Sequence, residues 1–204
     1  MELSPDYWNK RYLEGNTPWD IGQVSPPIKS FIDKLSDKQL RILIPGAGKG
    51  YEAIYLHQQG FTNVFVCDWA EEAFQTLKTK APDFPLQQLI VGDFFKLTGY
   101  FDLILEQTFF CAISPVLRTA YVQQCCRLLS SGGQVAGLLF GTTFPTPGPP
   151  FGGTVAEYER LFQPYFHIIT LEVCQNSIPP RLGNELFFHL ALENWQEKQN
   201  KIPQ

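Results

Sequence analysis

The chain has 204 residues, of which 44% are hydrophobic and 18% charged, as expected of a single globular domain. Its formal net charge is −4 and it contains no lysine- and arginine-rich run, which argues against nucleic acid as the main partner because phosphate contacts need a basic patch. No apolar stretch reaches membrane-spanning length, so no membrane partner is expected.

The cysteine content points away from both a secreted protein and a metal protein. The five cysteines are odd in number and form no Cys-x-x-Cys pair, so neither a disulfide framework nor a zinc site is expected. The first six residues are polar and turn-like, unlike a signal peptide. These features predict a reducing, cytoplasmic location. They do not determine the oligomeric state, and a monomer is compatible with them.

Two helices are predicted before residue 39. Ser4-Pro5-Asp6 is typical of a helix start, and the aromatic residues that follow have helical spacing up to Tyr12. Residues 15–18, Gly-Asn-Thr-Pro, end this helix. Pro26-Pro27 opens the second one.

The remainder of the chain alternates between short apolar runs and helical segments. Strands are predicted at 41–44, 64–67, 86–91, 101–105 and 134–140, and helices at 51–59, 70–80, 115–129 and 155–162. The glycines at 132–133 are expected to end the third of these helices. Residues 166–174 and 185–193 have no helix between them and are predicted to form an antiparallel pair. The pattern predicts an α/β domain whose mostly parallel sheet carries one antiparallel strand and helices on both faces.

A glycine-rich segment, Gly46-Ala-Gly48-Lys-Gly50, stands directly between a predicted strand and a predicted helix. Glycine lets the backbone approach a ligand closely, and the helix start offers free N–H groups. A dinucleotide fingerprint would need its third glycine at Tyr51, one position later. The segment is therefore interpreted as a ligand-binding loop, with an ordinary tight turn as the alternative.

Two acids follow the next two strands. Asp68 could accept hydrogen bonds from ribose hydroxyls, or it could cap the following helix. Asp93 could accept from an adenine amino group with Phe94 under the ring, or it could be a solvated turn residue. With the glycine loop, they place three nucleoside contacts at three successive strand ends, which is more specific than any one of them.

This constellation resembles the Rossmann-like class I methyltransferases, and more narrowly the thiopurine S-methyltransferase family with its plant-type halide and thiol methyltransferase branch. The resemblance covers about residues 7 to 193. Its motifs are Trp8-Asn-Lys-Arg-Tyr12, the Pro-Trp-Asp-x-Gly segment at 18–22, Leu43-Ile-Pro-Gly46, Phe109-Phe-Cys-Ala-Ile113 and Ser177-Ile-Pro-Pro-Arg181.

The resemblance implies one methyltransferase domain over 1–204, in which residues 1–38 form an N-terminal helical lid and residues 39–195 form the core. It implies S-adenosylmethionine as cofactor. Trp8, Tyr12 and Trp19 would fold over it, and an aromatic face attracts a sulfonium cation. The alternative for these side chains is a purely structural role, in which they pack the N-terminus onto the domain.

Further site residues are implied by the same resemblance. Glu106 and Gln107 end the fourth predicted strand, where the branch commonly has Asp-Tyr, so the contact at Gln107 and the acceptor pocket are expected to differ. Arg118 and Arg181 match family arginines that could steer an anionic acceptor or form surface ion pairs. Phe140 stands where halide-methylating members often have tyrosine, which argues against a halide.

The predicted function is methyl transfer from S-adenosylmethionine to a small soft nucleophile, namely a thiol, sulfide, thiocyanate, halide or thiopurine-like compound. Catalysis is expected from positioning and desolvation, without a catalytic cysteine. One alternative is a catalytically silent cofactor-binding relative. Another is an NAD-dependent dehydrogenase, but the spacing of Gly46, Gly48 and Gly50 does not match the dinucleotide fingerprint.

Overall fold

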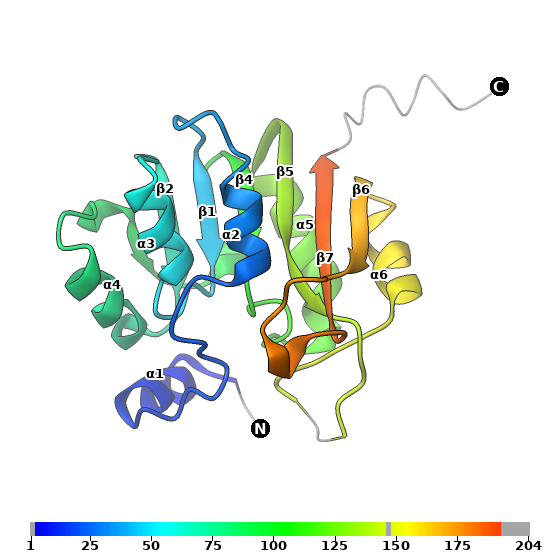
Figure 1. Cartoon of the computed structure of the whole chain (residues 1–204), viewed down its shortest axis with the longest axis horizontal. Coiled ribbons are helices and arrows are strands. Elements are labelled where there is room, and N and C mark those ends of the chain that lie inside the picture. The colour runs from blue at the N-terminus through cyan, green and yellow to red at the C-terminus, as the bar shows by residue number, and fades with distance from the viewer. Residues whose placement is uncertain (1–2, 146–147, 193–204) are drawn as a thin grey trace.

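The computed structural model describes residues 3–145 and 148–192, and seven strands within them form one sheet (Figure 1). The strands are β1 Ile42–Pro45, β2 Val64–Asp68, β3 Leu89–Val91, β4 Phe101–Glu106, β5 Leu129–Phe140, β6 Phe166–Val173 and β7 Glu185–Leu192. The α-helices are α1 Pro5–Leu13, α2 Pro26–Ile32, α3 Tyr51–Gln58, α4 Gln75–Lys80, α5 Arg118–Leu128 and α6 Val155–Phe162. The 3-10 helices are η1 Glu71–Phe74, η2 Leu86–Gln88, η3 Phe94–Lys96, η4 Pro115–Leu117 and η5 Pro179–Arg181.

The strand order is β3-β2-β1-β4-β5-β7-β6. The pairs from β3 to β5 are parallel, whereas β7 runs antiparallel to both β5 and β6. This confirms the predicted sheet with one antiparallel strand. The chain builds outward from β1 on one side and then from β4 on the other, so the topological switch point lies between β1 and β4. Sheets of this kind bind ligands in the crevice at the carboxyl ends of their strands.

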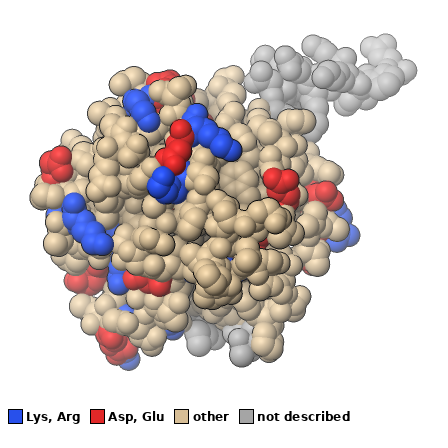
Figure 2. Space-filling model, viewed as in Figure 1, with Lys and Arg blue, Asp and Glu red and all other residues tan. Residues whose placement is uncertain are grey.

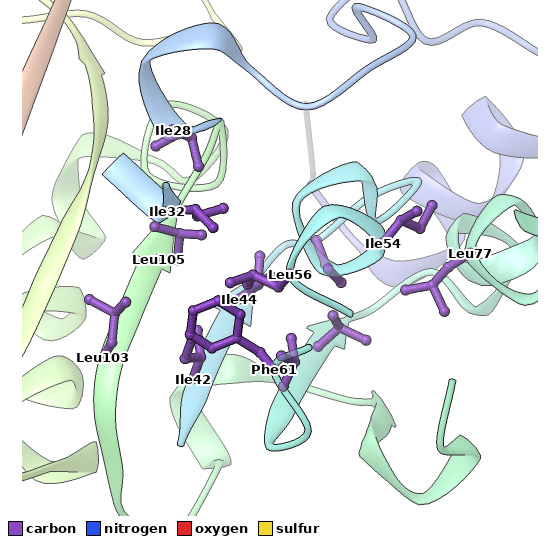
Figure 3. Packing of buried hydrophobic residues seen from close by; sticks show 14 of the residues in the cluster. Ile28, Ile32, Ile42, Ile44, Ile54, Leu56, Phe61, Leu77, Leu103 and Leu105 are labelled. Atoms are coloured by element: carbon purple, nitrogen blue, oxygen red, sulfur yellow. The ribbon is translucent and has the colours of Figure 1, made fainter. Parts of the chain in front are cut away.

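Helices cover both faces of the sheet, as predicted (Figure 1). Side chains of β1 alternate between them: Ile42 and Ile44 join the core under α2, α3 and α4, and Leu43 joins the core under α5 and α6. A strand buried on both faces is apolar throughout, which explains why this segment has no polar alternation. The core under α2 is shown in Figure 3, where Ile28 and Ile32 lie over Leu105.

Several predicted boundaries are wrong. Segment 86–91 begins as the 3-10 helix η2, and only its last three residues form β3. Segment 70–80 is divided into η1 and α4. The glycines at 132–133 do not end α5, because Leu129 is already extended and pairs with Phe101 in β4. The register then shifts before Leu103 pairs with Gln134, so the glycines lie where the pairing of β5 with β4 is irregular.

The outer surface carries mixed charge. On the face shown in Figure 2, lysine and arginine side chains lie among acidic ones. Among the described residues, no helix is long and apolar enough to cross a membrane. The end of the predicted core, residues 193–195, lies outside the described residues.

Truncating a side chain in the core between the sheet and α2, α3 and α4 should destabilise the fold. Leu105 is fully buried, so Leu105→Ala should lower the free energy of unfolding by about 2–5 kcal/mol through lost burial and a residual cavity. Urea denaturation followed by circular dichroism measures this. Leu86→Ala is the matched control, since Leu86 is 67% exposed. Equal stability of the two variants would contradict this account of the core.

Candidate functional site

A cavity of about 530 Å³ lies at the carboxyl ends of the parallel strands. Its volume is in the range of small-molecule sites. The predicted site residues that line it are Trp8, Tyr12, Trp19, Gly46, Asp68, Asp93, Phe94, Phe140 and Arg181. Residues from the N-terminus, from the strand ends and from the β6–β7 connection therefore share one space.

The glycine loop forms part of the cavity wall and needs its glycines. Gly46, Gly48 and Gly50 have φ angles of 55°, 52° and 72°, in the left-handed region that favours glycine. A Cβ at Gly46 would lie 2.5 Å from the Phe109 ring, and one at Gly48 would lie 3.0 Å from the Tyr12 hydroxyl. The loop therefore permits close packing of aromatic side chains against its backbone.

Asp68 links this loop to the end of β2. Its carboxylate accepts hydrogen bonds from the Gly48 amide at 3.0 Å and from the Ala70 amide at 2.9 Å. Burial raises the pKa of Asp68, and these backbone donors partly offset the effect. A carboxylate has about four lone-pair positions, so it can still accept bonds from a ligand.

The next strand end contributes the Asp93 turn and an aromatic wall. Asp93 Oδ1 accepts from the Phe95 amide at 2.9 Å, which fixes the turn into η3. Phe94 is 2% exposed and meets Phe109 edge-on at 5.2 Å between ring centroids. The acid and the aromatic face therefore lie side by side along the cavity.

The N-terminal aromatic residues form a cluster over the cavity. Trp8 and Trp19 meet edge-on at 5.5 Å between ring centroids, and Tyr12 lies 6.0 Å from Trp19. Arg11, whose guanidinium stands 4.8 Å from the Trp19 ring, also lines the cavity. No residue of α1 is fully buried, so its inward side chains mainly cover the cavity.

Asp20 explains the Pro-Trp-Asp-x-Gly segment in physical terms. One carboxylate oxygen accepts from the Gly22 amide at 2.8 Å, and the other pairs with Lys49 of the glycine loop at 2.5 Å. The sequence interpretation did not assign a role to either charged residue, although both lie within motifs that it used. The presence of oppositely charged residues in two motif segments could have indicated this ion pair.

Glu106 lies behind the cavity wall and is fully buried. Its Oε1 accepts from the amides of Phe109 and Phe110 at 2.8 and 2.9 Å, and its Oε2 accepts from the Tyr121 hydroxyl at 3.1 Å. Burial raises the pKa of Glu106 to about 7. Thr108, in the turn closed by these bonds, has a φ of 66°, which is strained for a β-branched residue.

Gln107 and Gly48 line a smaller recess of about 60 Å³ beside the main cavity. Tyr12, Trp19, Gly46 and Thr108 line both spaces. The Gln107 Oε1 atom is buried and has no hydrogen-bond partner among the described residues. An unpartnered buried acceptor is costly in a folded protein, so this atom is available to a ligand donor.

The two candidate arginines are in different surroundings. Arg181 lines the cavity and pairs with Glu185 at 3.2 Å. Arg118 is absent from the cavity lining; its Nη2 donates to the Gly152 carbonyl at 3.0 Å, and its guanidinium stacks 4.9 Å from the Phe110 ring. The structure therefore does not bring these two arginines together.

Cys111 lines the cavity but its thiol is unsuited to nucleophilic attack. It is buried, burial raises the pKa of the thiol to about 12, and its Sγ donates to the Thr108 carbonyl at 3.2 Å. A thiol with such a pKa carries almost no thiolate at neutral pH.

Comparison with known proteins identifies the family. The thiopurine S-methyltransferase family model matches residues 3–198. The chain belongs to the thiopurine S-methyltransferase family. It is 32% identical to probable thiol methyltransferase 2 of Arabidopsis thaliana, over 90% of this chain and 84% of that protein. It is 29% identical to thiocyanate methyltransferase 1 of the same plant, over 87% and 81%.

A solved structure shares the fold. The 1,6-didemethyltoxoflavin-N1-methyltransferase of Burkholderia thailandensis, determined with S-adenosylhomocysteine, superposes with a TM-score of 0.76 at 17% identity. The match covers 93% of this chain and 87% of that one. The fold of the chain is therefore the Rossmann-like class I methyltransferase fold. Its family and its methyltransferase relatives show that the chain is an S-adenosylmethionine-dependent methyltransferase, as predicted.

The cavity fits this cofactor on chemical grounds. Asp68 and Asp93 offer carboxylate acceptors at two neighbouring strand ends, and Phe94 offers an aromatic face beside them. The glycines at 46 and 48 let the aromatic side chains of Phe109 and Tyr12, which also line the cavity, pack directly on the loop backbone. The unpartnered Gln107 oxygen adds an acceptor nearby.

Removing the Asp68 carboxylate should weaken binding of S-adenosylhomocysteine. Asp68→Ala loses the ligand acceptor and frees the Gly48 amide, so the dissociation constant should rise roughly ten-fold or more, equivalent to at least about 1.4 kcal/mol. Isothermal titration calorimetry measures this. Asp83→Ala, at an exposed acid paired with His57, is the control. Unchanged affinity in Asp68→Ala would remove this residue from the site.

Glu106 should make stability depend on pH. Its pKa is raised in the folded state from 4.5 to about 7, so the folded protein holds a proton that the unfolded chain releases. The free energy of unfolding should therefore fall by about 3 kcal/mol as the pH rises from 4.5 to 7, and Glu106→Gln should lack this component. Urea unfolding at pH 5 and pH 8 measures the difference. Glu71→Gln, at an exposed acid, is the control, and an equal pH dependence in wild type and Glu106→Gln would contradict the assignment.

Proposed function

We propose that the protein transfers the methyl group of S-adenosylmethionine to a thiol or to sulfide. The supporting observation is one cavity lined by residues from both sides of the switch point, acids after β2 and β3 on one side and Phe140 of β5 on the other. Asp68 and Asp93 mark the nucleoside end, and Phe140, Pro149 and Pro150 mark the acceptor end. A methyl donor and its acceptor can therefore meet within it.

Bound S-adenosylmethionine supplies a methyl group on a positively charged sulfur. The chain contributes position, an apolar environment and aromatic faces. Trp8, Tyr12 and Trp19 surround the space with rings that attract a cation, and the apolar walls strip water from a soft nucleophile. Holding the two reactants in line supplies the remaining acceleration without a strong general base.

A thiol suits the acceptor end better than a small anion. Phe140 offers no hydroxyl to an anion there. The charge of Arg181 is compensated by Glu185, whose side chain is 3% exposed. The names of the relatives include thiol and thiocyanate methyltransferases, so both acceptor classes belong in the test.

The remaining assignments are part of the same proposal. Residues 1–38 act as the lid and residues from 39 onward as the core of a single methyltransferase domain. The reaction takes place in the cytoplasm, which the five free cysteines support, because a reducing compartment keeps thiols free.

Turnover should be found first with thiols. Purified protein is given S-adenosylmethionine with methanethiol, an aromatic thiol, hydrogen sulfide, thiocyanate or iodide, and S-adenosylhomocysteine formation is measured. Formation with a thiol or sulfide, exceeding that with the two inorganic anions, supports the proposal. Binding of the cofactor without turnover of any acceptor would favour a catalytically silent relative instead.

The pH dependence provides an independent criterion. The thiol of free cysteine has a pKa of about 8.5 and a simple alkyl thiol such as methanethiol has a higher one, so the rate with methanethiol should rise between pH 6 and 9 as thiolate forms. The rate with thiocyanate should stay nearly constant, since that anion does not titrate in this range. A flat profile for the thiol would contradict attack by the free thiolate.

A further inference from the structure

Residues 17–22 cross the cavity between α1 and α2 and are held from two sides. Lys49, in the glycine loop after β1, pairs with Asp20 at 2.5 Å. Arg181, in η5 between β6 and β7, donates from Nη2 to the main-chain carbonyl of Trp19 at 2.6 Å. Figure 1 shows α1 and η5 beyond the same edge of the sheet, so the segment spans the space between the two halves of the domain.

The sheet fixes the direction of the Arg181 guanidinium. Its Nη1 donates to Glu185 Oε1 at 3.2 Å, and Glu185 begins β7 opposite Phe140 of β5. The side chains of Arg181 and Glu185 are 12% and 3% exposed. A planar guanidinium can hold two partners at once in a fixed geometry, which the compact ammonium of lysine cannot do.

We propose that Arg181 is a positioning residue that latches residues 17–22 over the bound cofactor, with Glu185 as its anchor. Two of its nitrogens have protein partners, one an acid that compensates its charge and the other the carbonyl of a cavity-lining tryptophan. This role differs from steering an anionic acceptor, which would need an uncompensated guanidinium. The inference rests on the proposed function only for the identity of the cofactor.

The latch has a kinetic consequence. The proposed latch implies that a ligand under Trp8 and Trp19 is released when residues 17–22 move away, a movement that breaks the Arg181–Trp19 bond. Lid opening and product release limit turnover in many enzymes. Weakening the latch should therefore speed the release of S-adenosylhomocysteine and raise the KM for S-adenosylmethionine, while kcat at saturating cofactor is maintained or increased.

Hydrogen–deuterium exchange of the full chain tests the latch directly. Arg181→Met should speed exchange of the amides in residues 17–22 by roughly ten-fold or more, because a buried charged partner is lost. Exchange of the sheet amides should stay unchanged. Arg181→Lys should have a smaller effect, and Arg160→Met, at an exposed arginine on α6, should have none.

Stopped-flow tryptophan fluorescence provides the second readout. Dissociation of S-adenosylhomocysteine should be at least about ten-fold faster in Arg181→Met than in wild type. Glu185→Gln should also speed release, since it removes the negative charge that anchors Arg181 and leaves only a neutral hydrogen-bond acceptor. If Arg181→Met loses sheet protection as well, Arg181→Lys and Glu185→Gln decide the question.

The latch and the proposed function fail in different ways. If Arg181→Met leaves both the amide exchange of residues 17–22 and the release of S-adenosylhomocysteine unchanged, the latch is overturned. If the same variant also raises the KM for the thiol, Arg181 acts on the acceptor instead. Neither exchange nor release requires an acceptor. If wild type turns over no acceptor, the proposed reaction fails while the latch is still tested by these two measurements.

Discussion

The hydrogen bond from the Gly48 amide to the Asp68 carboxylate is the contact on which the binding cavity depends. It joins the loop after β1 to the end of β2 and so fixes the loop beside the switch point of the sheet. Burying a carboxylate is costly unless donors compensate it, and the amides of Gly48 and Ala70 do so. Because backbone donors satisfy only part of its capacity, the acid that holds the loop together can also face a ligand.

Glu106, which is fully buried, shapes another part of the cavity wall by the same principle. Glu106 gathers the Phe109 and Phe110 amides into one turn, and that turn places the Phe109 ring against the backbone of Gly46. The strained φ of Thr108 is sustained by these bonds. One carboxylate thus organises the loop and the other organises the aromatic side chain packed on it, so the two walls of the cavity are mutually dependent.

The sequence was sufficient for the fold class because apolar strands and helices alternate clearly, as β1 illustrates. The prediction failed where contacts with a distant segment, and not the local sequence, determine the structure. The glycines at 132–133 have the local character of a helix end, yet pairing of Leu129 with Phe101 draws them into β5. For the site, strand-end residues such as Asp68 could be foreseen because parallel strands bring their carboxyl ends together. The partners of Arg181 could not, since its bond to Trp19 joins residues 162 positions apart.

The distribution of charge along the cavity links the cofactor to the choice of acceptor. Asp68 and Asp93 line the cavity beside β2 and β3, the rings of Trp8 and Trp19 line it from the N-terminal segment, and the charge of Arg181 is compensated by Glu185. Such a field favours a sulfonium cation and gives a small anion little reward for losing its water. In the proposed reaction the thiolate that forms in solution attacks, and its charge is cancelled by that of the sulfonium as the methyl group is transferred. In the proposed latch, pairing Arg181 with Glu185 would serve two purposes, since it would hold residues 17–22 in place and remove the attraction that would draw competing anions into the site.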